Sequence, residues 1–162
     1  MLEDSIPIRD DLNSSSAKML NTLGTLLLAL VSLVTSLIIL GALVRANEAG
    51  LACPDWPLCF GQILPELDLK IGFELTHRFV AGVVSLLFLL IFYRCRRDRV
   101  AWDKASAWLS LAACLLVTQI ILGALTVWHL LAAWSVTAHL LTGNAFNMSI
   151  WLAGWRLRKP RD

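Results

Sequence analysis

A carboxylate, an imidazole and a guanidinium lie close together at Glu74, His77 and Arg78, beside a long apolar run. Ionisable side chains inside a membrane span are costly, so they mark functional sites by default. Glu74 and His77 are three residues apart and share one face of a helix, with Arg78 next to them. His139 is the only other histidine inside an apolar run. The chemistry therefore depends on whether His77 and His139 meet.

The segments that must position these residues are membrane helices. Of the 162 residues, 57% are hydrophobic and only 16% are charged, and the mean hydropathy is +0.68. A soluble domain carries nearer a quarter charged residues. Backbone groups in lipid must be satisfied within the segment, which favours helices over strands. The sequence predicts an all-α integral membrane protein with a bundle of four transmembrane helices, at about 22–44, 71–93, 105–128 and 133–155.

The positions of the lysines and arginines predict the orientation of the helices. These residues gather before the first span, between the second and third spans, and after the fourth, whereas the opposite side has only Arg45 and Lys70. Basic loops stay in the cytoplasm. We expect a multi-pass protein of the cell (inner) membrane with both termini cytoplasmic. The predicted parts are a polar tail at 1–21, a four-helix transmembrane bundle at 22–155 with an outer loop at 45–70, and a basic tail at 156–162. The net charge of +2 gives no case for nucleic acid.

Two cysteines, Cys53 and Cys59, lie in the predicted outer loop together with Trp56 and two prolines. Disulfides form in oxidising compartments, so the pair indicates a disulfide that closes a small loop. A redox-active pair is an alternative. A metal site is a weaker one, because no histidine or second cysteine pair is near. Cys95 and Cys114 are expected to be free thiols.

His77 and His139 each lie about six residues from the outer start of a predicted span, which is ~9 Å at 1.5 Å per residue. Both spans run inward, so the imidazoles are expected at a similar depth. Facing helices of a bundle build cofactor sites, and two imidazoles suit axial ligation of a haem iron. Arg78 and Arg45 lie at the level where the anionic haem propionates would emerge.

Several other interpretations of these residues stay open. A zinc site would need a third ligand, which Glu74 could supply. Each histidine could instead bond to a carbonyl of a neighbouring helix. Arg78 could pair only with Glu74, and Arg45 could be a simple interfacial anchor. The small and polar residues at 142–147, among them Thr142, Asn144 and Asn147, are expected to form hydrogen bonds between helices.

Several motifs in order along the chain resemble the haem A synthase family. They are Gly-Ala-Leu-Val-Arg at 41–45, Gly-Leu-Ala-Cys-Pro-Asp-Trp-Pro-Leu-Cys-Phe-Gly at 50–61, Glu-Leu-Thr-His-Arg at 74–78, Leu-Gly-Ala-Leu-Thr-Val at 122–127 and Ala-His-Leu at 138–140. The order and spacing match over about residues 40 to 145. The cysteine string and the Glu-x-x-His-Arg motif together make the resemblance specific.

The resemblance implies an oxidoreductase that acts on a CH group, oxidising a methyl group of haem O to the formyl group of haem A for cytochrome oxidase. His77 and His139 would be the axial ligands of the substrate haem. Glu74 would be the essential acidic residue near the reacting edge. Cys53 and Cys59 would form the outer-loop disulfide. The implied cofactors are haem O and haem A as substrate and product, with haem b as a further candidate.

The family is typically built of two similar four-helix halves, and this chain resembles the N-terminal half. We therefore expect a half-length enzyme that works as a homo-oligomer or with a second four-helix chain. A haem O synthase and an electron acceptor are further expected partners. The alternative is a bis-histidine haem-binding subunit for electron transfer or assembly, without turnover.

Overall fold

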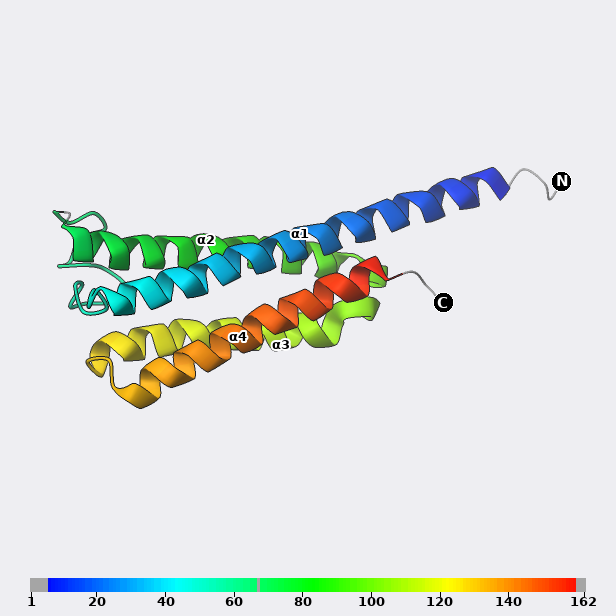
Figure 1. Ribbon diagram of the computed structural model, residues 1–162. Coiled ribbons are helices and arrows are strands. Elements are labelled where there is room, and N and C mark those ends of the chain that lie inside the picture. The colour runs from blue at the N-terminus through cyan, green and yellow to red at the C-terminus, as the bar shows by residue number, and fades with distance from the viewer. Residues whose placement is uncertain (1–5, 67, 160–162) are drawn as a thin grey trace.

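Four long helices make up the chain in a computed structural model that describes residues 6–66 and 68–159, with side chains described from residue 14 onward. They are α1 (Ile6–Ala46), α2 (Leu69–Arg97), α3 (Arg99–Trp128) and α4 (Ala133–Arg158). Figure 1 shows the helices side by side, with the α1–α2 and α3–α4 connections at one end and both termini at the other. These are called the loop end and the terminus end below.

Three of these helices are long and apolar enough to cross a membrane, namely Ser14–Ala46 of α1, α2 and α3. Within the described residues α4 does not meet the same criterion. It carries His139, Asn144 and Asn147, which lower its apolar character. The all-helical architecture is confirmed. The fourth span and the side of the membrane on which the termini lie stay predictions.

The helices are longer than the predicted apolar runs. α1 begins at Ile6, inside the stretch expected to be a polar tail, and residues 1–5 and 160–162 of the two predicted tails lie outside the described residues. Asp98 alone separates α2 from α3. Its carboxylate accepts the Ala101 N–H at 2.7 Å and its own N–H donates to the Cys95 carbonyl at 3.3 Å. Asp98 thus caps the end of α2 and the start of α3. The basic residues expected in a loop between the second and third spans lie instead at the ends of these two helices.

Helices α1 and α3 each pack against both α2 and α4, so α2 and α4 face each other diagonally across the bundle. In Figure 1 the α1–α2 pair and the α3–α4 pair converge toward the terminus end and separate toward the loop end. Gly24 and Gly154 mark the closest approach of α1 and α4, because a Cβ on Gly154 would lie 3.1 Å from the Gly24 carbonyl oxygen. Small residues permit such contacts between membrane helices.

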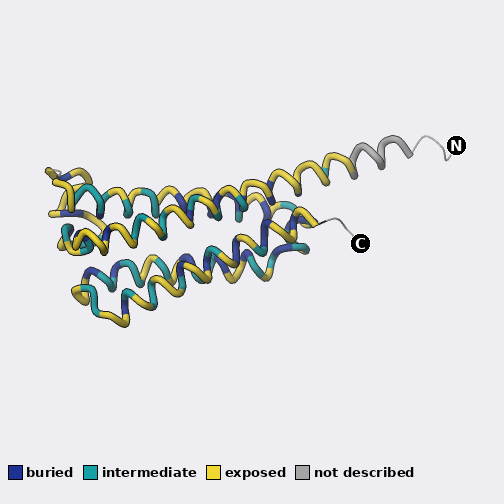
Figure 2. Tube along the Cα trace, in the orientation of Figure 1, coloured by how far each residue is buried: buried dark blue, intermediate teal, exposed yellow. Residues whose placement is uncertain are grey.

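The hydrophobic core occupies the terminus half of the bundle. Leu27, Phe88, Leu109 and Ile150, one from each helix, are fully buried there. Figure 2 shows buried positions concentrated where the helices converge. In the loop half, past Val34 of α1 and Leu116 of α3, the buried residues of the helices are small, medium-sized or polar: Val44, Glu74, Ala124, Val127, Ser135 and Gly143. The large side chains that fill the other half are missing at these positions.

Candidate functional site

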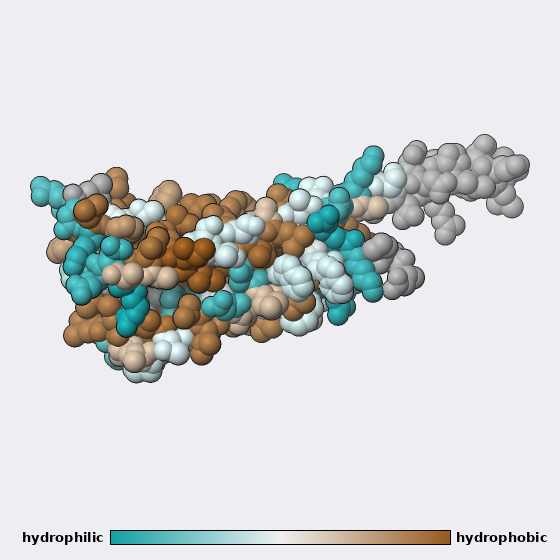
Figure 3. Space-filling view, viewed as in Figure 1, coloured by the Kyte–Doolittle hydropathy of each residue, from teal (hydrophilic) through white to brown (hydrophobic). Residues whose placement is uncertain are grey.

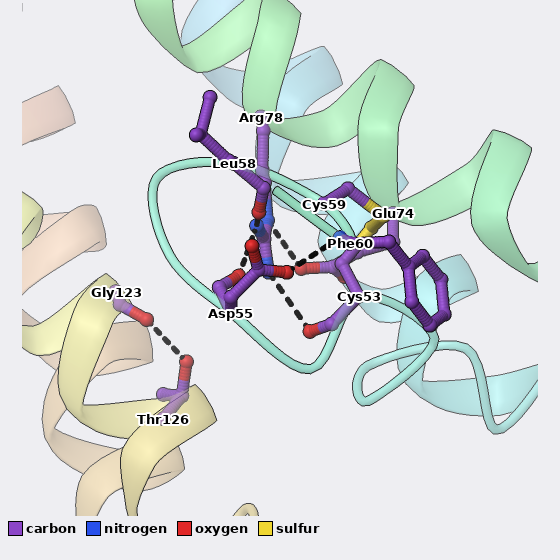
Figure 4. A network of polar contacts seen from close by, with 9 residues as sticks. All are labelled: Cys53, Asp55, Leu58, Cys59, Phe60, Glu74, Arg78, Gly123 and Thr126. Atoms are coloured by element: carbon purple, nitrogen blue, oxygen red, sulfur yellow. Dashed lines mark hydrogen bonds and ion pairs between the residues drawn. A yellow bond between two sulfur atoms is a disulfide. The ribbon is translucent and has the colours of Figure 1, made fainter. Parts of the chain in front are cut away.

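Arg78 of α2 fastens the loop that follows α1 to this helix. Its Nη1 donates to the carbonyls of Asp55 at 2.8 Å and Leu58 at 2.7 Å, and its Nη2 reaches the Cys53 carbonyl at 3.4 Å. Its Nε donates to Glu74 Oε1 at 2.9 Å, as Figure 4 shows. Four of the five guanidinium N–H groups are therefore occupied by the protein itself.

The carboxylate of Asp55 holds a tight turn in the same loop. It accepts the backbone N–H groups of Phe60 at 2.6 Å and Gly61 at 2.7 Å. Both residues have positive φ, 54° and 71°, a conformation that only glycine adopts without strain. The Gly61 hydrogen bond, with that of Phe60 and the nearby Arg78 charge, lowers the pKa of the Asp55 carboxyl. An ionised Asp55 thus stabilises the turn.

The loop is closed by a disulfide between Cys53 and Cys59, both fully buried. It also packs on the connection between α3 and α4. Trp56 meets Trp128 edge to face with ring centroids 6.3 Å apart, and a Cβ on Gly50 would lie 3.2 Å from a methyl of Leu131. The two connections therefore meet and cover the loop end of the bundle. Cys95 and Cys114 are free thiols.

Glu74 points inward from α2 and only 12% of its side chain is exposed. Its Oε1 is held by Arg78, and no other described residue hydrogen bonds to this carboxylate. A buried carboxylate needs such a partner, because an unpaired buried charge is costly. Oε2 is consequently the oxygen that can act on a ligand.

His77 lies against a glycine of α1. A Cβ on Gly41 would lie 3.1 Å from His77 Nε2 and 3.6 Å from its Cε1. A contact of 3.1 Å is tighter than ordinary van der Waals packing, so the absence of a side chain at Gly41 provides the space for the imidazole. His77 is eight residues from the start of α2, about 12 Å along the helix axis.

His139 lies against a glycine of α3 in a similar way, with more room. A Cβ on Gly123 would lie 3.5 Å from His139 Cε1, an ordinary contact distance. The ring interacts with the backbone of Gln119, whereas its Nδ1 is buried and has no hydrogen-bond partner among the described residues. Buried polar atoms are nearly always paired, so an unpaired nitrogen indicates a missing ligand or proton partner. The Gly123 carbonyl itself accepts the Thr126 hydroxyl at 2.7 Å.

The two histidines share one region of the bundle. They stand on the diagonally opposed helices α2 and α4, and the imidazoles are near enough for the charge of one to act on the other. His139 is six residues from the start of α4, about 9 Å along its axis, close to the depth of His77. Among the described residues no group of three or more His, Cys, Asp or Glu is placed to hold a metal ion. This gives the zinc alternative no support.

The two arginines predicted to meet a ligand differ in their surroundings. Arg78 is largely buried and occupied by the loop and Glu74, which is more than the single pairing considered from the sequence. Arg45 is exposed on the last turn of α1. His129 is also exposed and meets Trp134 edge to face. Arg45 is therefore the arginine whose guanidinium remains open to solvent.

The glycines beside the histidines were not predicted as site residues, although the sequence contains a signal for them. The string Leu-Gly-Ala-Leu occurs at 40–43 and again at 122–125. In each case its glycine faces the histidine of the following helix. The repeat therefore marks two corresponding histidine pockets, a tight one of His77 with Gly41 and a roomier one of His139 with Gly123.

Two polar residues of α4 form the interhelical hydrogen bonds expected from the sequence, whereas Asn144 donates to the Leu140 carbonyl of its own helix at 2.8 Å. Thr142 donates to Gln119 Oε1 of α3 at 3.0 Å, and Asn147 donates to Thr35 Oγ1 of α1 at 3.0 Å. Asn147 Oδ1 is buried without a partner in the described structure. These bonds hold α4 against α3 and α1 in the part of the helix that follows His139.

Known proteins are similar in sequence to most of this chain. The sequence model of the COX15-CtaA family, described as cytochrome oxidase assembly protein, matches residues 24–162. A haem A synthase of Shewanella oneidensis is 34% identical over 85% of this chain and 46% of its own length. The chain belongs to the haem A synthase family. The resemblance found in its motifs is confirmed.

Two further curated proteins are similar to parts of the chain. A haem A synthase of Caulobacter vibrioides is 29% identical over 75% of this chain and 39% of its own length. A protoheme IX farnesyltransferase 1 of Natronomonas pharaonis is 33% identical over 76% of this chain and 28% of its own length. The chain spans about half the length of the curated relatives it matches, or less. No solved structure was found to match it.

Proposed function

We propose that this membrane protein oxidises the methyl group of haem O to the formyl group of haem A, with His77 and His139 as the axial ligands of the substrate iron. One observation carries the proposal. Two imidazoles stand at similar depth on diagonally opposed helices, in the half of the bundle that lacks fully buried large hydrophobic side chains. Family membership supports a role in haem A biosynthesis for cytochrome oxidase.

The residues at this site fit a haem. His139 Nδ1 is buried, and no described residue forms a hydrogen bond with it, so this nitrogen is available to a partner outside the described chain. His77 Nε2 lies where Gly41 leaves room for the ring to turn. Iron in haem takes imidazole as an axial ligand and leaves the macrocycle in an apolar slot. Arg45, exposed at the same end, is the better placed of the two arginines to meet a propionate.

The reaction requires a base near the methyl group. A methyl group and one water give a formyl group, four electrons and four protons. The haem supplies the redox chemistry and the protein supplies orientation and proton transfer. Glu74, held through Oε1 by Arg78, offers Oε2 to take a proton or to position the water. The electrons go to a one-electron acceptor, for which a second haem is the proposed class.

The proposed assembly contains more than one four-helix unit. One histidine pair serves one haem, and the third histidine, His129, is exposed at the loop end. We propose that a second copy, or a second four-helix chain, holds the electron-accepting haem. The match within a protoheme IX farnesyltransferase supports a substrate that carries a farnesyl group and a haem O synthase as the protein that delivers it. All four helices would span the cell membrane, with the disulfide loop outside.

A second candidate function is haem binding for electron transfer or assembly, without turnover. The single histidine pair favours it, because it leaves no electron route within the described chain. Glu74 argues against it, since axial ligation does not require a buried carboxylate paired with Arg78.

The deciding experiment is the identity of the haem extracted from the purified protein after co-production with a haem O synthase. Haem A, or haem O with a hydroxylated methyl group, supports oxidation. Glu74→Gln should retain haem O but form no haem A, and Glu48→Gln, an exposed acid of the loop end, should behave as the wild type. Haem b alone in the wild type would favour the second function. Unchanged haem A formation in Glu74→Gln would remove the role given to that residue.

A further inference from the structure

A cavity of about 350 Å³ opens between α1 and α4 at the terminus end, far from the histidines. It is lined by Leu28, Trp151, Trp155, Arg158 and Lys159. Arg158 is 19 residues beyond His139, about 28 Å along α4. The haem proposal uses none of the residues that line it.

The backbone of the helix crossing fixes the position of Arg158. A Cβ on Gly24 would lie 2.5 Å from Arg158 Cγ and 2.9 Å from the Gly154 carbonyl oxygen. The aliphatic stem of Arg158 therefore lies across the bare backbone of Gly24, and the charged group extends past it. Within the described residues no carboxylate forms an ion pair with Arg158.

More positive charge surrounds the same place. Lys159 lines the cavity beside Arg158, and Lys104 of α3 donates to the Lys159 carbonyl at 2.7 Å. Figure 3 shows hydrophilic side chains crossing the terminus end of this face, next to the hydrophobic surface of the bundle. An anionic group at this boundary would therefore meet the positive charges of Arg158, Lys159 and Lys104.

The other walls of the cavity are apolar and aromatic. Trp151 and Trp155 are one helical turn apart and 44% and 49% exposed, and Leu28 faces them from α1. Tryptophan favours the headgroup level of a bilayer, and basic pockets between membrane helices bind anionic lipid headgroups. The site thus offers cations at one end and indole and leucine surface at the other, the pattern of a phospholipid.

We propose that this cavity binds a phospholipid with a net negative headgroup, its phosphate at Arg158 and Lys159 and an acyl chain along Trp151 and Leu28. The inference stands independently of the proposed haem chemistry. The cavity volume lies in the range of small-ligand sites, and the charge of its rim selects against lipids without net charge.

The test is native mass spectrometry of the full chain in detergent, titrated with phosphatidylglycerol or with phosphatidylcholine of the same acyl chains. We expect tighter binding of phosphatidylglycerol. The double variant Arg158→Gln with Lys159→Gln should lose about fivefold in that preference for each charge removed. Arg156→Gln is the matched control, because Arg156 is an exposed cation of the same turn that does not line the cavity. Its preference should stay within about twofold of the wild type.

Three results would overturn the proposal. Equal binding of the two lipids by the wild type would show no headgroup selection, and equal losses in Arg156→Gln and the double variant would show only a general effect of charge. Displacement of phosphatidylglycerol by millimolar inorganic phosphate would indicate a site for a soluble anion. If the double variant does not fold, two other measurements decide. Arg158→Lys keeps the charge and should retain the preference for phosphatidylglycerol. Binding of phosphatidylglycerol by the wild type should weaken as the salt concentration rises.

Discussion

The two halves of the bundle differ in the side chains that the same four helices bury between them. In the terminus half, one large side chain from each helix is fully buried and the helices touch through glycine. In the loop half, the buried positions are small or polar, and glycines face histidines instead of helix backbone. The comparison teaches that packing is concentrated where no chemistry is needed. The loop half is held instead by the disulfide loop and the hydrogen bonds of Arg78.

Removal of either histidine should have the largest effect on the loop half. We expect His77→Ala and His139→Ala to lose bound haem almost completely, because each would supply one of two axial ligands. The absorption spectrum and the haem content of the purified protein measure this. His129→Ala is the control and should retain haem, since His129 is exposed. Full haem content in either of the first two variants would contradict the axial assignment.

A change in the terminus half should affect stability and not the site. Phe88 is fully buried and its ring lies 5.3 Å from that of Phe146. Phe88→Ala should lower the free energy of unfolding by about 3–5 kcal/mol, because it leaves a cavity. Denaturant titration in detergent gives this value. Leu89→Ala, an exposed neighbour, should cost far less. Haem binding by folded Phe88→Ala should persist, and its loss would mean that the two halves are not separable.

Loss of Arg78 should lower the stability of the loop half, because it removes the bonds between α2 and the disulfide loop. Arg78→Gln breaks the bonds to Glu74 and to the loop carbonyls, and it leaves a buried carboxylate without its partner. Breaking such a pair costs about 3 kcal/mol of unfolding free energy. Arg45→Gln, at an exposed position, should change stability by no more than about 0.5 kcal/mol. Thermal unfolding of the two variants side by side makes the measurement. Similar values for both would remove the fastening role of Arg78.

The two histidine pockets should respond unequally to an added methyl group. Gly41→Ala places a Cβ 3.1 Å from His77 Nε2, whereas Gly123→Ala places one at an ordinary 3.5 Å from His139. Overpacking of this kind costs about 1–3 kcal/mol, so Gly41→Ala should lower stability and weaken haem binding. Gly123→Ala should remain close to the wild type in both. Haem titration and unfolding of the two variants test the difference, and a larger effect at Gly123 would reverse it.

The smallest expected effect concerns pH at the loop. Hydrogen bonds from Gly61 and Phe60 lower the pKa of Asp55, so the ionised carboxylate stabilises the turn above the usual carboxyl pKa of about 4. This stabilisation is lost as the pH falls through the lowered value. Reduction of the Cys53–Cys59 disulfide by a phosphine should therefore accelerate below about pH 4. Asp55→Asn should be faster at all pH values and less dependent on pH. A wild-type rate without such a rise would contradict the role of Asp55.

The sequence predicts most of the helices and the pairing of Cys53 with Cys59, because long apolar runs and two cysteines close together in one loop are strong physical signals. It also predicts the similar depth of His77 and His139, since depth follows from helix rise. It does not predict that Arg78 binds the carbonyls of Asp55 and Leu58, because those bonds depend on the path of an irregular loop. Nor does composition reveal that a single residue, Asp98, separates α2 from α3.

The length of α1 has a mechanical consequence. Its 41 residues extend about 60 Å, roughly twice the thickness of the hydrocarbon core of a bilayer. Figure 1 shows its N-terminal part projecting beyond the other helices. With the predicted span of 22–44 in the membrane, the first 16 residues of α1 stand clear of it as a stiff rod of about 24 Å. A partner that binds this rod would be held at a fixed height, roughly 20 Å from the membrane surface, and would turn with the bundle as one body.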